Sequence, residues 1–484
     1  MNERPLRFAI IGAGMAGILA AIKLEEAGHP DWTIYEKADR LGGTWRENTY
    51  PGIACDVPSH LYRYSFEPNA EWSQRFAPGE EIQAYLERVA DKYGVSDRIQ
   101  FGQELTRCAF EDGRWHIETR AGLSDVADVV IGATGVLHHP NEVEIAGRED
   151  FEGAIFHSAR WDHDAPLEGR RIGVIGTGSS AIQIVTALVQ SVGKLSLFQR
   201  TAQWIMPQEN LTYTEDEKRA FREEPDRMQK LQADLTKSFS ETFSNAVVDA
   251  NSEELIRIEA LCRENLEESV VDPELREQLR PDYRPACKRL VLSPGFYDAI
   301  QHANAELVTS GIERIEAGGV RTEDGQLHEL DVLVLATGFR LDRFMRPAEI
   351  VGRNGIRLDD VWGRHPSAYL SVSVPDFPNL FMLNGPNGPV GNFSLIDVAE
   401  HQMAYILQLV EKIRSGEVRE VSASHESTEA FEAERVEATK GTIWTSGCQS
   451  WYLDDRGIPI AWPWSVARFR AEMEKPDLSA YEMI

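Results

Sequence analysis

The sequence predicts an α/β fold in which the same strand–turn–helix unit occurs twice, with a helical insertion in the second unit. A glycine-rich turn between an apolar strand and a helical pattern appears as F-A-I-I-G-A-G-M-A-G and again as I-G-V-I-G-T-G-S-S-A. A buried-strand run ending in Ala-Thr-Gly also occurs twice and closes at Gly135 and Gly338. These glycines lie 123 residues after Gly12 and 162 residues after Gly176, so the second unit holds a net insertion of about 39 residues.

The first turn contains Gly12, Gly14 and Gly17, and a helical pattern from Ile18 follows it. In such a turn the first glycine permits the tight bend and the second lets the backbone approach a pyrophosphate. The third lets the helix pack closely on the strand, and the helix N-terminus favours the phosphate charge. The spacing therefore predicts a Rossmann-like dinucleotide-binding domain.

The second turn has Gly176, Gly178 and Ala181 at the same spacing. In each unit, 24 positions lead from the first glycine to a charged residue at a strand end, Glu36 in the first and Arg200 in the second. A carboxylate at this position accepts hydrogen bonds from a ribose 2′-OH, whereas an arginine matches a 2′-phosphate. We therefore expect FAD in the first unit and NADPH in the second.

The domain organisation follows from these repeats. Residues 1–137 are expected to form the first part of the FAD-binding domain, and residues 138–156 a linker. Residues 157–375 form the predicted NADP-binding domain. Within it, residues 208–284 are charge-rich, poor in glycine and apolar at helical spacing, which predicts the helical insertion. The C-terminal part, 376–484, is expected to return to the FAD-binding domain.

Composition restricts the compartment and the partners. The net charge of −28 argues against nucleic acid and anionic membranes as partners. No apolar run approaches the ~18 residues of a membrane span, and the N-terminal residues lead directly into a strand, which predicts no signal peptide. We expect a cytoplasmic protein.

Cysteine spacing restricts the chemistry further. The five cysteines form no C-x-x-C or C-x-x-x-x-C pair; they are Cys55, Cys108, Cys262, Cys287 and Cys448. This spacing predicts a reducing compartment, no metal site and no dithiol relay. Flavin disulfide reductases share a two-site architecture but need such a pair, so the spacing argues against them.

A motif joins the two units. It reads F-E-G-A-I-F-H-S-A-R-W-D and contains Phe151, Gly153, His157 and Trp161. The motif resembles F-x-G-x-x-x-H-x-x-x-W-[PD], the fingerprint of type I Baeyer–Villiger monooxygenases. Further segments resemble this family over nearly the whole chain, namely L-G-G-T-W-R-E-N-T-Y-P-G-I-A-C-D, F-Q-R-T, C-K-R-L, A-T-G-F and C-Q-S-W-Y. The resemblance implies that the motif couples domain movement to catalysis, as suits residues at a hinge.

The resemblance also implies the catalytic residues. The family oxidises ketones through a C4a-peroxyflavin, which is a nucleophile only while it is anionic. Such a site needs a fixed cation, and arginine keeps its proton at any working pH. The position that matches the family's arginine is Arg289, and Asp56 matches the acid that orients it.

The same comparison assigns residues to the cofactors. Arg200, Thr201 and Lys288 match the family's contacts with the 2′-phosphate of NADPH. Thr44 and Trp45 match its contacts along the flavin nucleotide. At the turn expected to face the NADPH pyrophosphate lie Ser179, Ser180 and Gln183.

These features predict an NADPH- and O2-dependent flavin monooxygenase that converts a ketone to an ester or lactone. A flavin monooxygenase that oxidises sulfur or nitrogen is the alternative, although its members carry Phe or Tyr at the position of Trp161 and generally lack Arg289. A third interpretation is a non-catalytic nucleotide-sensing module.

The C-terminal segment W-Y-L-D-D-R-G-I-P-I-A-W-P-W-S differs from that of cyclohexanone-type members and looks more like that of the branch acting on aryl ketones and polyketides. Its Trp462 and Trp464 are expected in the substrate pocket or in the core.

Overall fold

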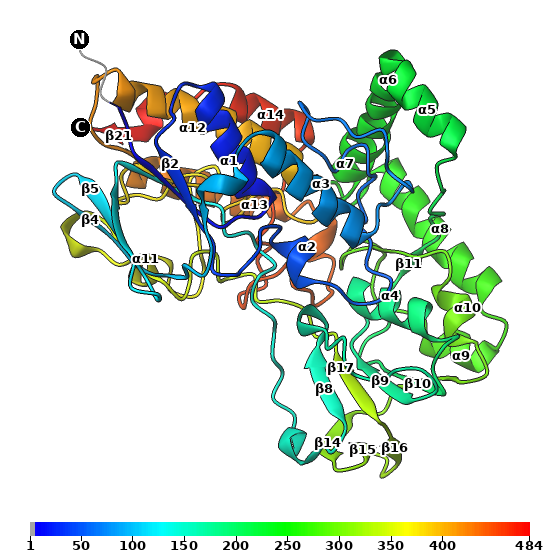
Figure 1. Ribbon diagram of the computed structural model, residues 1–484. Helices are drawn as coiled ribbons and strands as arrows, with labels where there is room; N and C mark the ends of the chain where they lie inside the picture. The colour runs from blue at the N-terminus through cyan, green and yellow to red at the C-terminus, as the bar shows by residue number, and fades with distance from the viewer. Residues whose placement is uncertain (1–4) are drawn as a thin grey trace.

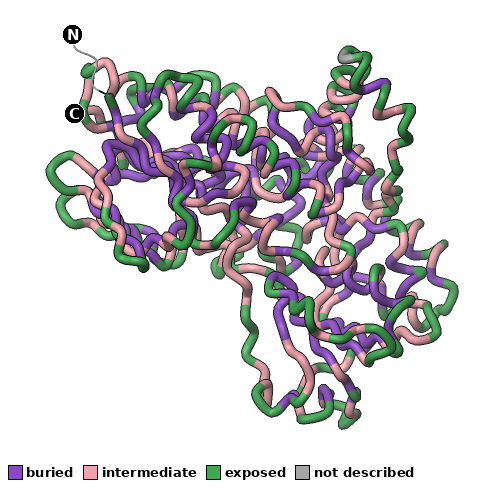
Figure 2. Tube along the Cα trace, in the orientation of Figure 1, coloured by how far each residue is buried: buried purple, intermediate pink, exposed green. Residues whose placement is uncertain are grey.

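The computed structural model describes residues 5–484, and it shows two lobes that each centre on a five-stranded parallel sheet (Figure 1). A group of helices lies beside them and is coloured green in Figure 1. Figure 2 shows that buried residues gather along the two sheets and on the helices that cover them, so each lobe has its own core. No helix among residues 5–484 is long and apolar enough to cross a membrane.

The first sheet is buried on both faces, which explains its continuous apolar strands. Phe8 and Ile10 face a core that the sheet shares with helices, whereas Ala9 and Ile11 face a core shared with an antiparallel sheet. All neighbouring strands pair in parallel, in the order β19–β7–β1–β2–β3. Their bounds are β1 Phe8–Ile11, β2 Trp32–Tyr35, β3 Ile99–Gln100, β7 Val129–Gly132 and β19 Leu380–Met382.

Helices cover one face of this sheet: α1 (Met15–Glu26), α3 (Gly79–Lys92), α12 (Leu395–Arg414) and α14 (Val466–Glu474). The other face carries an antiparallel sheet of β4 (Leu105–Glu111), β5 (Arg114–Thr119) and β6 (Ser124–Ala127), and β18 (Glu349–Val351) extends it in parallel with β4. The chain thus returns to the first lobe before the expected boundary at residue 376. Ile350 pairs with Cys108 and is buried in the same core, which draws this segment into the first lobe.

The second sheet repeats the arrangement, with strands in the order β13–β10–β9–β17–β8. Their bounds are β8 Ala154–His157, β9 Arg171–Ile175, β10 Lys194–Phe198, β13 Ala305–Val308 and β17 Val332–Leu335. Helix α4 (Ser179–Leu188) and helix α10 (Phe296–Ile300) pack into one core, and β14 (Ile312–Glu316), β15 (Gly319–Thr322) and β16 (Leu327–Glu329) border the other. Because β8 begins at Ala154 and pairs with β17, the end of the expected linker 138–156 already belongs to this sheet.

The expected insertion is helical. It contains α5 (Glu215–Glu223), α6 (Pro225–Leu235), the π-helix η4 (Thr236–Phe243), α7 (Ser244–Ala246), α8 (Glu253–Ser269) and α9 (Pro273–Gln278). Thr214 caps the N-terminus of α5, and its side chain forms a capping box with Glu217. Helix α8 buries Leu255, Ile258 and Cys262, which recur at helical spacing. Strands β11 (Ile205–Met206) and β12 (Val291–Leu292) pair at the base of the insertion.

The remaining elements are short or lie near the C-terminus, where β20 (Val421–Ala423) and β21 (Tyr481–Met483) pair in antiparallel. They also include α2 Thr44–Glu47, α11 Leu358–Trp362, α13 His425–Thr439 and the 3₁₀ turns η1 Ser96–Arg98, η2 Arg148–Asp150, η3 Ser158–Arg160, η5 Arg353–Gly355, η6 Ile443–Thr445 and η7 Leu478–Ala480. Figure 1 places β21 beside the start of the first lobe, so the C-terminal part completes that lobe.

Candidate functional site

A cavity of about 550 Å³, here called the central cavity, lies where the two glycine-rich turns open toward each other. Both fingerprints contribute to its lining, although they are far apart in sequence. The predicted site residues that line it are Gly12, Gly14, Glu36, Thr44, Trp45, Asp56, Gly178, Ser179, Ser180, Gln183 and Arg289. The predicted residues outside its lining are Gly17, Gly176, Arg200, Thr201, Lys288, Phe151, Gly153, His157 and Trp161.

The Ala-Thr-Gly repeats explain the first glycine of each turn. Gly12 has a φ of +106° and Gly176 a φ of +121°. A Cβ at Gly12 would crowd the carbonyl of Ala133, and one at Gly176 would crowd the carbonyl of Ala336. These alanines begin the two Ala-Thr-Gly runs, so each run closes against the first glycine of its own fingerprint. The two repeats therefore form one structural unit, present twice.

Of the other fingerprint glycines, Gly17 allows close packing, whereas Gly178 faces open space. A Cβ at Gly17 would overlap the carbonyl of Gly12, so Gly17 permits the close approach of α1 to the turn. A Cβ at Gly178 would meet nothing within 4 Å, because this position faces the central cavity. Gly178 immediately precedes α4, whose free backbone N–H groups attract an anion. Both turns thus fit a dinucleotide pyrophosphate.

Glu36 follows the end of β2, and its side chain turns back over the first fingerprint. Its carboxylate accepts hydrogen bonds from the backbone N–H of Ala13 at 2.8 Å and of Ala38 at 2.9 Å. Arg46 also donates to it at 3.0 Å. Glu36 is buried, so these bonds hold the carboxylate in one orientation at the edge of the cavity.

Arg200 follows β10, the strand of the second unit that corresponds to β2 in the first. It is exposed, and its charge acts on the nearby Lys288. Burial lowers the pKa of Lys288, Asp282 opposes this shift, and the repulsion from Arg200 adds to it. The backbone carbonyl of Thr201 accepts a hydrogen bond from Thr177 at 2.8 Å, which joins this strand end to the second fingerprint. Arg200 and Lys288 are thus close enough for their charges to interact, and the Lys288 ammonium lies over the Tyr283 ring, 4.7 Å from its centroid.

Arg289 is held against the central cavity from two sides. Its Nε and Nη2 donate to the same Asp56 carboxylate oxygen at 3.0 Å and 2.5 Å, and its Nη1 donates to the carbonyl of Gly391 at 2.8 Å. Burial acts to lower the pKa of Arg289, but the charge of Asp56 and the neighbouring Tyr452 outweigh it, and the pKa is raised. The guanidinium is therefore a permanent cation in a fixed place.

Gln183 and Trp45 have structural partners that the sequence did not indicate. Gln183 accepts a hydrogen bond from the Tyr50 hydroxyl at 2.8 Å and donates to the Ala54 carbonyl at 3.0 Å. It thus ties α4 of the second unit to a loop of the first. Trp45 is buried and donates to the Tyr62 hydroxyl at 3.2 Å. Sequence reasoning missed Tyr50 and Tyr452 as site residues: both lie in segments that resemble the family, but neither was assigned a role.

The linker motif packs on the second unit and stays outside the central cavity. His157 is buried at the end of β8; its Nδ1 accepts from the backbone N–H of Ala159 at 3.0 Å, and its Nε2 lies 3.1 Å from the Gly338 carbonyl. Burial lowers the pKa of His157 against the effect of the Gly338 carbonyl, so the ring is neutral with its proton on Nε2. Trp161 packs edge-on against Phe156 at 5.0 Å between ring centroids. A 3₁₀ turn, Ser158–Arg160, separates His157 from Trp161.

The rest of the motif fits tightly around the same strand. A Cβ at Gly153 would crowd both the carbonyl of Asp331 and the ring of Phe151. Phe151 is buried in the core beneath the second sheet. The motif therefore forms the edge of the second lobe.

Cys287 and Cys448 form a disulfide across 161 residues of sequence. The expectation of a reducing compartment did not anticipate this crosslink, because it rested on the absence of cysteine pairs close together in the sequence. Cys55, Cys108 and Cys262 are free and buried. Neither Cys287 nor Cys448 is among the residues lining the central cavity.

Two further hollows adjoin the central cavity. A recess of about 230 Å³, here called the apolar recess, shares Asp56, Arg289 and Gly391 with it and is otherwise lined largely by apolar side chains. Phe239 and Phe243, from η4, stack at 5.6 Å in its wall.

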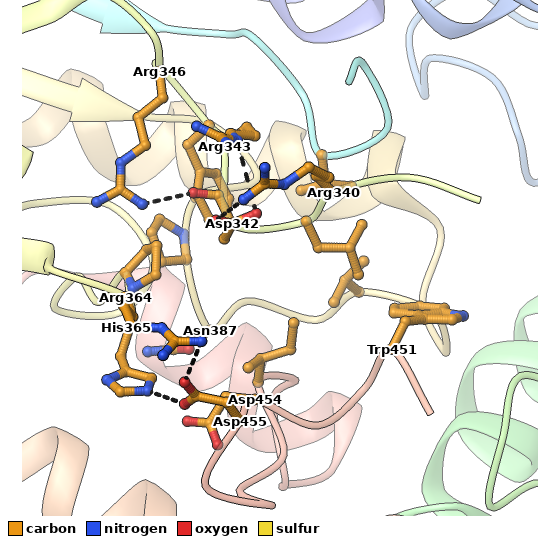
Figure 3. A pocket seen from close by; sticks show the side chains of 18 of the residues that line it. Arg340, Asp342, Arg343, Arg346, Arg364, His365, Asn387, Trp451, Asp454 and Asp455 are labelled. Carbon is orange, nitrogen blue, oxygen red and sulfur yellow. Dashed lines mark hydrogen bonds and ion pairs between the residues drawn. The ribbon is translucent and has the colours of Figure 1, made fainter. Parts of the chain in front are cut away.

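A chamber of about 690 Å³, the charged chamber of Figure 3, shares Trp451 and Phe339 with the central cavity. Asp455 pairs there with Arg364 at 2.8 Å and with His365 at 2.5 Å. These pairs join the C-terminal loop to the first lobe.

The C-terminal tryptophans divide between core and cavity. Trp462 is fully buried in the core of the first lobe, and Trp464 packs against Phe431 and beneath the guanidinium of Arg468. Neither Trp462 nor Trp464 lines any of the three hollows. The tryptophan of the C-terminal part that lines the central cavity is Trp451.

Known proteins resemble this chain in both sequence and fold. The family described as Pyridine nucleotide-disulphide oxidoreductase matches residues 9–253. An uncharacterised monooxygenase of Mycobacterium tuberculosis is 48% identical, over 100% of this chain and 98% of that protein. A Baeyer–Villiger monooxygenase of Streptomyces coelicolor is 39% identical, over 99% of this chain and 93% of that protein.

A solved structure agrees with this relationship. Cyclohexanone monooxygenase from Rhodococcus sp. Phi1 bound to NADP⁺ superposes with a TM-score of 0.89 at 30% identity and covers 99% of both chains. The expected α/β fold with two dinucleotide-binding domains is confirmed, and the expected family is confirmed with it. The chain belongs to the Baeyer–Villiger monooxygenase family.

Proposed function

We propose that this protein is an NADPH- and O2-dependent flavin monooxygenase that converts a ketone to an ester or lactone. The observation that carries the proposal is Arg289, a permanent cation held by Asp56 and Gly391 at a cavity lined by both dinucleotide fingerprints. Membership of the Baeyer–Villiger family supports the same reaction.

FAD binds in the first unit. Gly12, Gly14 and the N-terminus of α1 receive its pyrophosphate, and Gly17 lets this helix approach. The carboxylate of Glu36, already oriented by backbone N–H groups, would accept a hydrogen bond from the ribose hydroxyl. Thr44 and Trp45, at the start of α2, line the central cavity and would contact the flavin nucleotide beyond its adenosine half.

NADPH binds in the second unit. The turn at Gly176 and Gly178 and the serines that begin α4 receive its pyrophosphate. The 2′-phosphate would be held by Arg200, which can pair with it through two hydrogen bonds, and by Lys288, which acts as a point charge.

When bound, FAD and NADPH would supply the redox chemistry that activates O2. The chain's contribution is placement and charge. Arg289 presents its positive charge to the anionic oxygen group that this chemistry requires, and Asp56 prevents the guanidinium from rotating away. Because Arg289 cannot lose its proton, this stabilisation persists over the whole working pH range.

The apolar recess beside Arg289 supports a hydrophobic ketone as the substrate. It opens at Arg289 and Asp56, and the stacked rings of Phe239 and Phe243 offer an apolar wall to the body of a substrate. A carbonyl placed at the mouth would lie next to the guanidinium, while the rest of the molecule would leave water.

Oxygenation assays on the purified flavoprotein test this function. The holoenzyme is mixed with NADPH, O2 and a panel of cyclic, aryl and steroid ketones, and the products are identified by mass. We expect ketone-dependent NADPH oxidation and a product with one added oxygen. An aryl sulfide in the same panel tests the alternative, because oxidation of the sulfide without insertion of oxygen into any ketone would overturn the proposal.

A further inference from the structure

The disulfide joins two segments that meet at Arg289. Cys287 lies two residues before Arg289, and Cys448 lies four residues before Tyr452, whose hydroxyl is beside the same guanidinium. The Cα atoms of the two cysteines are 6.1 Å apart, and both cysteines are buried. The Sγ of Cys287 also lies 3.9 Å from the carbonyl of Trp444. The crosslink therefore connects the base of the helical insertion to the C-terminal loop.

The segment that carries Arg289 is short and fixed at both ends. The disulfide holds it at Cys287, and β12 begins at Val291, where it pairs with β11. Between these points, the backbone carbonyl of Arg289 accepts a hydrogen bond from Gln203 at 2.7 Å. Only Lys288, Arg289 and Leu290 lie between the two anchors, so the position of the disulfide limits where the guanidinium can reach.

The C-terminal loop supports the acceptors of Arg289 from the other side. The Tyr452 hydroxyl packs so closely on Gly391 that a Cβ there would overlap it, and Gly391 accepts the Nη1 hydrogen bond of Arg289. Gly391 has a φ of +95°, a conformation that glycine adopts readily. Tyr452 in turn packs on Trp444, with ring centroids 5.3 Å apart, close to the disulfide. Arg289, Gly391 and Tyr452 thus form one packed group from three chain segments, and the crosslink ties together the two that carry Arg289 and Tyr452.

We propose that the Cys287–Cys448 disulfide is a crosslink that holds the Arg289 guanidinium in the position the reaction needs. Reduction of this disulfide then uncouples NADPH oxidation from ketone oxygenation. This inference rests on the proposed function. Reduction adds two electrons and two protons to the disulfide and yields two thiols, while a dithiol or phosphine reductant is oxidised. The two cysteines line none of the three hollows, so they act through the segment that carries Arg289.

The first measurement establishes the crosslink. The protein is purified with and without a phosphine reductant, denatured, alkylated and weighed intact. The structure has three free cysteines among the five in the sequence, so we expect three alkyl groups on the oxidised protein and five on the reduced one. Five alkyl groups on protein purified without reductant would overturn the proposal.

The second measurement compares ester formed per NADPH consumed in the oxidised protein, the reduced protein and the variants Cys287→Ala and Cys448→Ala. A displacement of about 1 Å at a reacting group can cost up to ~100-fold, so we expect this ratio to fall roughly fivefold or more in the reduced protein and in both variants. Reoxidation of the reduced wild-type protein should restore the ratio. In Cys287→Ala the reductant should change nothing further.

Cys262→Ala is the matched control, because Cys262 is an equally buried but unpaired cysteine of the same lobe. It should keep the wild-type ratio with and without reductant. All assays use protein with full FAD content, well below its unfolding temperature, so that a loss of stability alone does not move the ratio.

The possible failures are distinguishable. If the wild-type protein forms ester and the two cysteine variants match its product ratio, the crosslink has no positioning role although the proposed function stands. If the wild-type protein oxygenates no ketone, the proposed function fails, whatever the alkylation count.

Discussion

We expect the cofactor preference to depend on the charge of one residue in each unit. Glu36 and Arg200 occupy equivalent strand ends, and both lie beside a glycine-rich turn. A charge-assisted hydrogen bond to a phosphate contributes on the order of 1.5–3 kcal/mol. We therefore expect NADPH to bind at least about tenfold more tightly than NADH.

Steady-state kinetics with both coenzymes checks this preference. Arg200→Ala should narrow the difference mainly by raising the KM for NADPH. Arg170→Ala is the control, since Arg170 is exposed just before β9, at the opposite end of the same sheet. Equal KM values for the two coenzymes in the wild-type protein would contradict the assignment of Arg200.

Arg289 provides the second prediction for a single residue. Arg289→Ala should retain FAD and bind NADPH yet lose ester formation by on the order of 10²–10³-fold, the usual cost of removing a preorganised charge. Arg289→Lys keeps the charge but not the two bonds to Asp56, so it should lose less than the alanine variant. Product yield at matched FAD content is the measurement. Near-normal ester formation by Arg289→Ala would mean that another cation performs this role.

Among the elements, the edge strand β8 and the 3₁₀ turn after it carry the linker motif. His157 bonds both to its own turn and to the Gly338 carbonyl, at the end of the second Ala-Thr-Gly run. It therefore connects the segment between the lobes to the strand that closes against the second fingerprint. A residue in this place is suited to coupling a domain movement to turnover.

His157→Ala should lower the ester formed per NADPH while the FAD content stays normal. His157→Gln offers a similar pair of polar groups and should retain more of the coupling. Bound flavin absorbance and product yield are measured together. If His157→Ala loses FAD or fails to fold, His157 serves only to hold the edge of the second lobe, and the coupling role is lost.

For the whole molecule, buried histidines predict how stability depends on pH. Burial, with a smaller contribution from Arg63, lowers the pKa of His60 to about 4. Neither ring nitrogen of His60 has a hydrogen-bond partner among residues 5–484. Between pH 6.5 and 4 the unfolded chain binds a proton at this histidine that the folded protein does not, so stability falls as the pH falls through this range.

The variant His60→Phe isolates this effect, because phenylalanine can keep the ring contacts with Tyr213 and Phe221 but cannot ionise. Urea unfolding at pH 7 and pH 5 should show that the variant loses about 1–2 kcal/mol less free energy of unfolding than the wild type over this interval. The same loss in both proteins would show that His60 is protonated in the folded state.

Local patterns in the sequence were sufficient for the two sheets and their turns. Continuous apolar strands, glycines at fixed spacing and a change to helical periodicity after each turn are properties of short segments, and each predicts its element without distant contacts. The charges at Glu36 and Arg200 follow from the same spacing. The helical insertion is visible because its composition differs from that of the sheets around it.

Contacts between distant residues required the tertiary structure. The pairing of β18 with β4, the disulfide between Cys287 and Cys448, and the bridge that Gln183 makes to Tyr50 join segments whose local sequences do not indicate one another. Asp56 and Arg289 were paired only through family resemblance, because 233 residues separate them and folding alone brings them together. The sequence by itself therefore determined two dinucleotide-binding units, with an acidic residue at a strand end of the first and a basic residue at the equivalent strand end of the second. Periodicity and turn chemistry are local properties, so no distant contact was needed. The tertiary structure decided which groups surround Arg289, since these groups come from distant segments, and their positions depend on how the insertion and the C-terminal loop pack around the cavity.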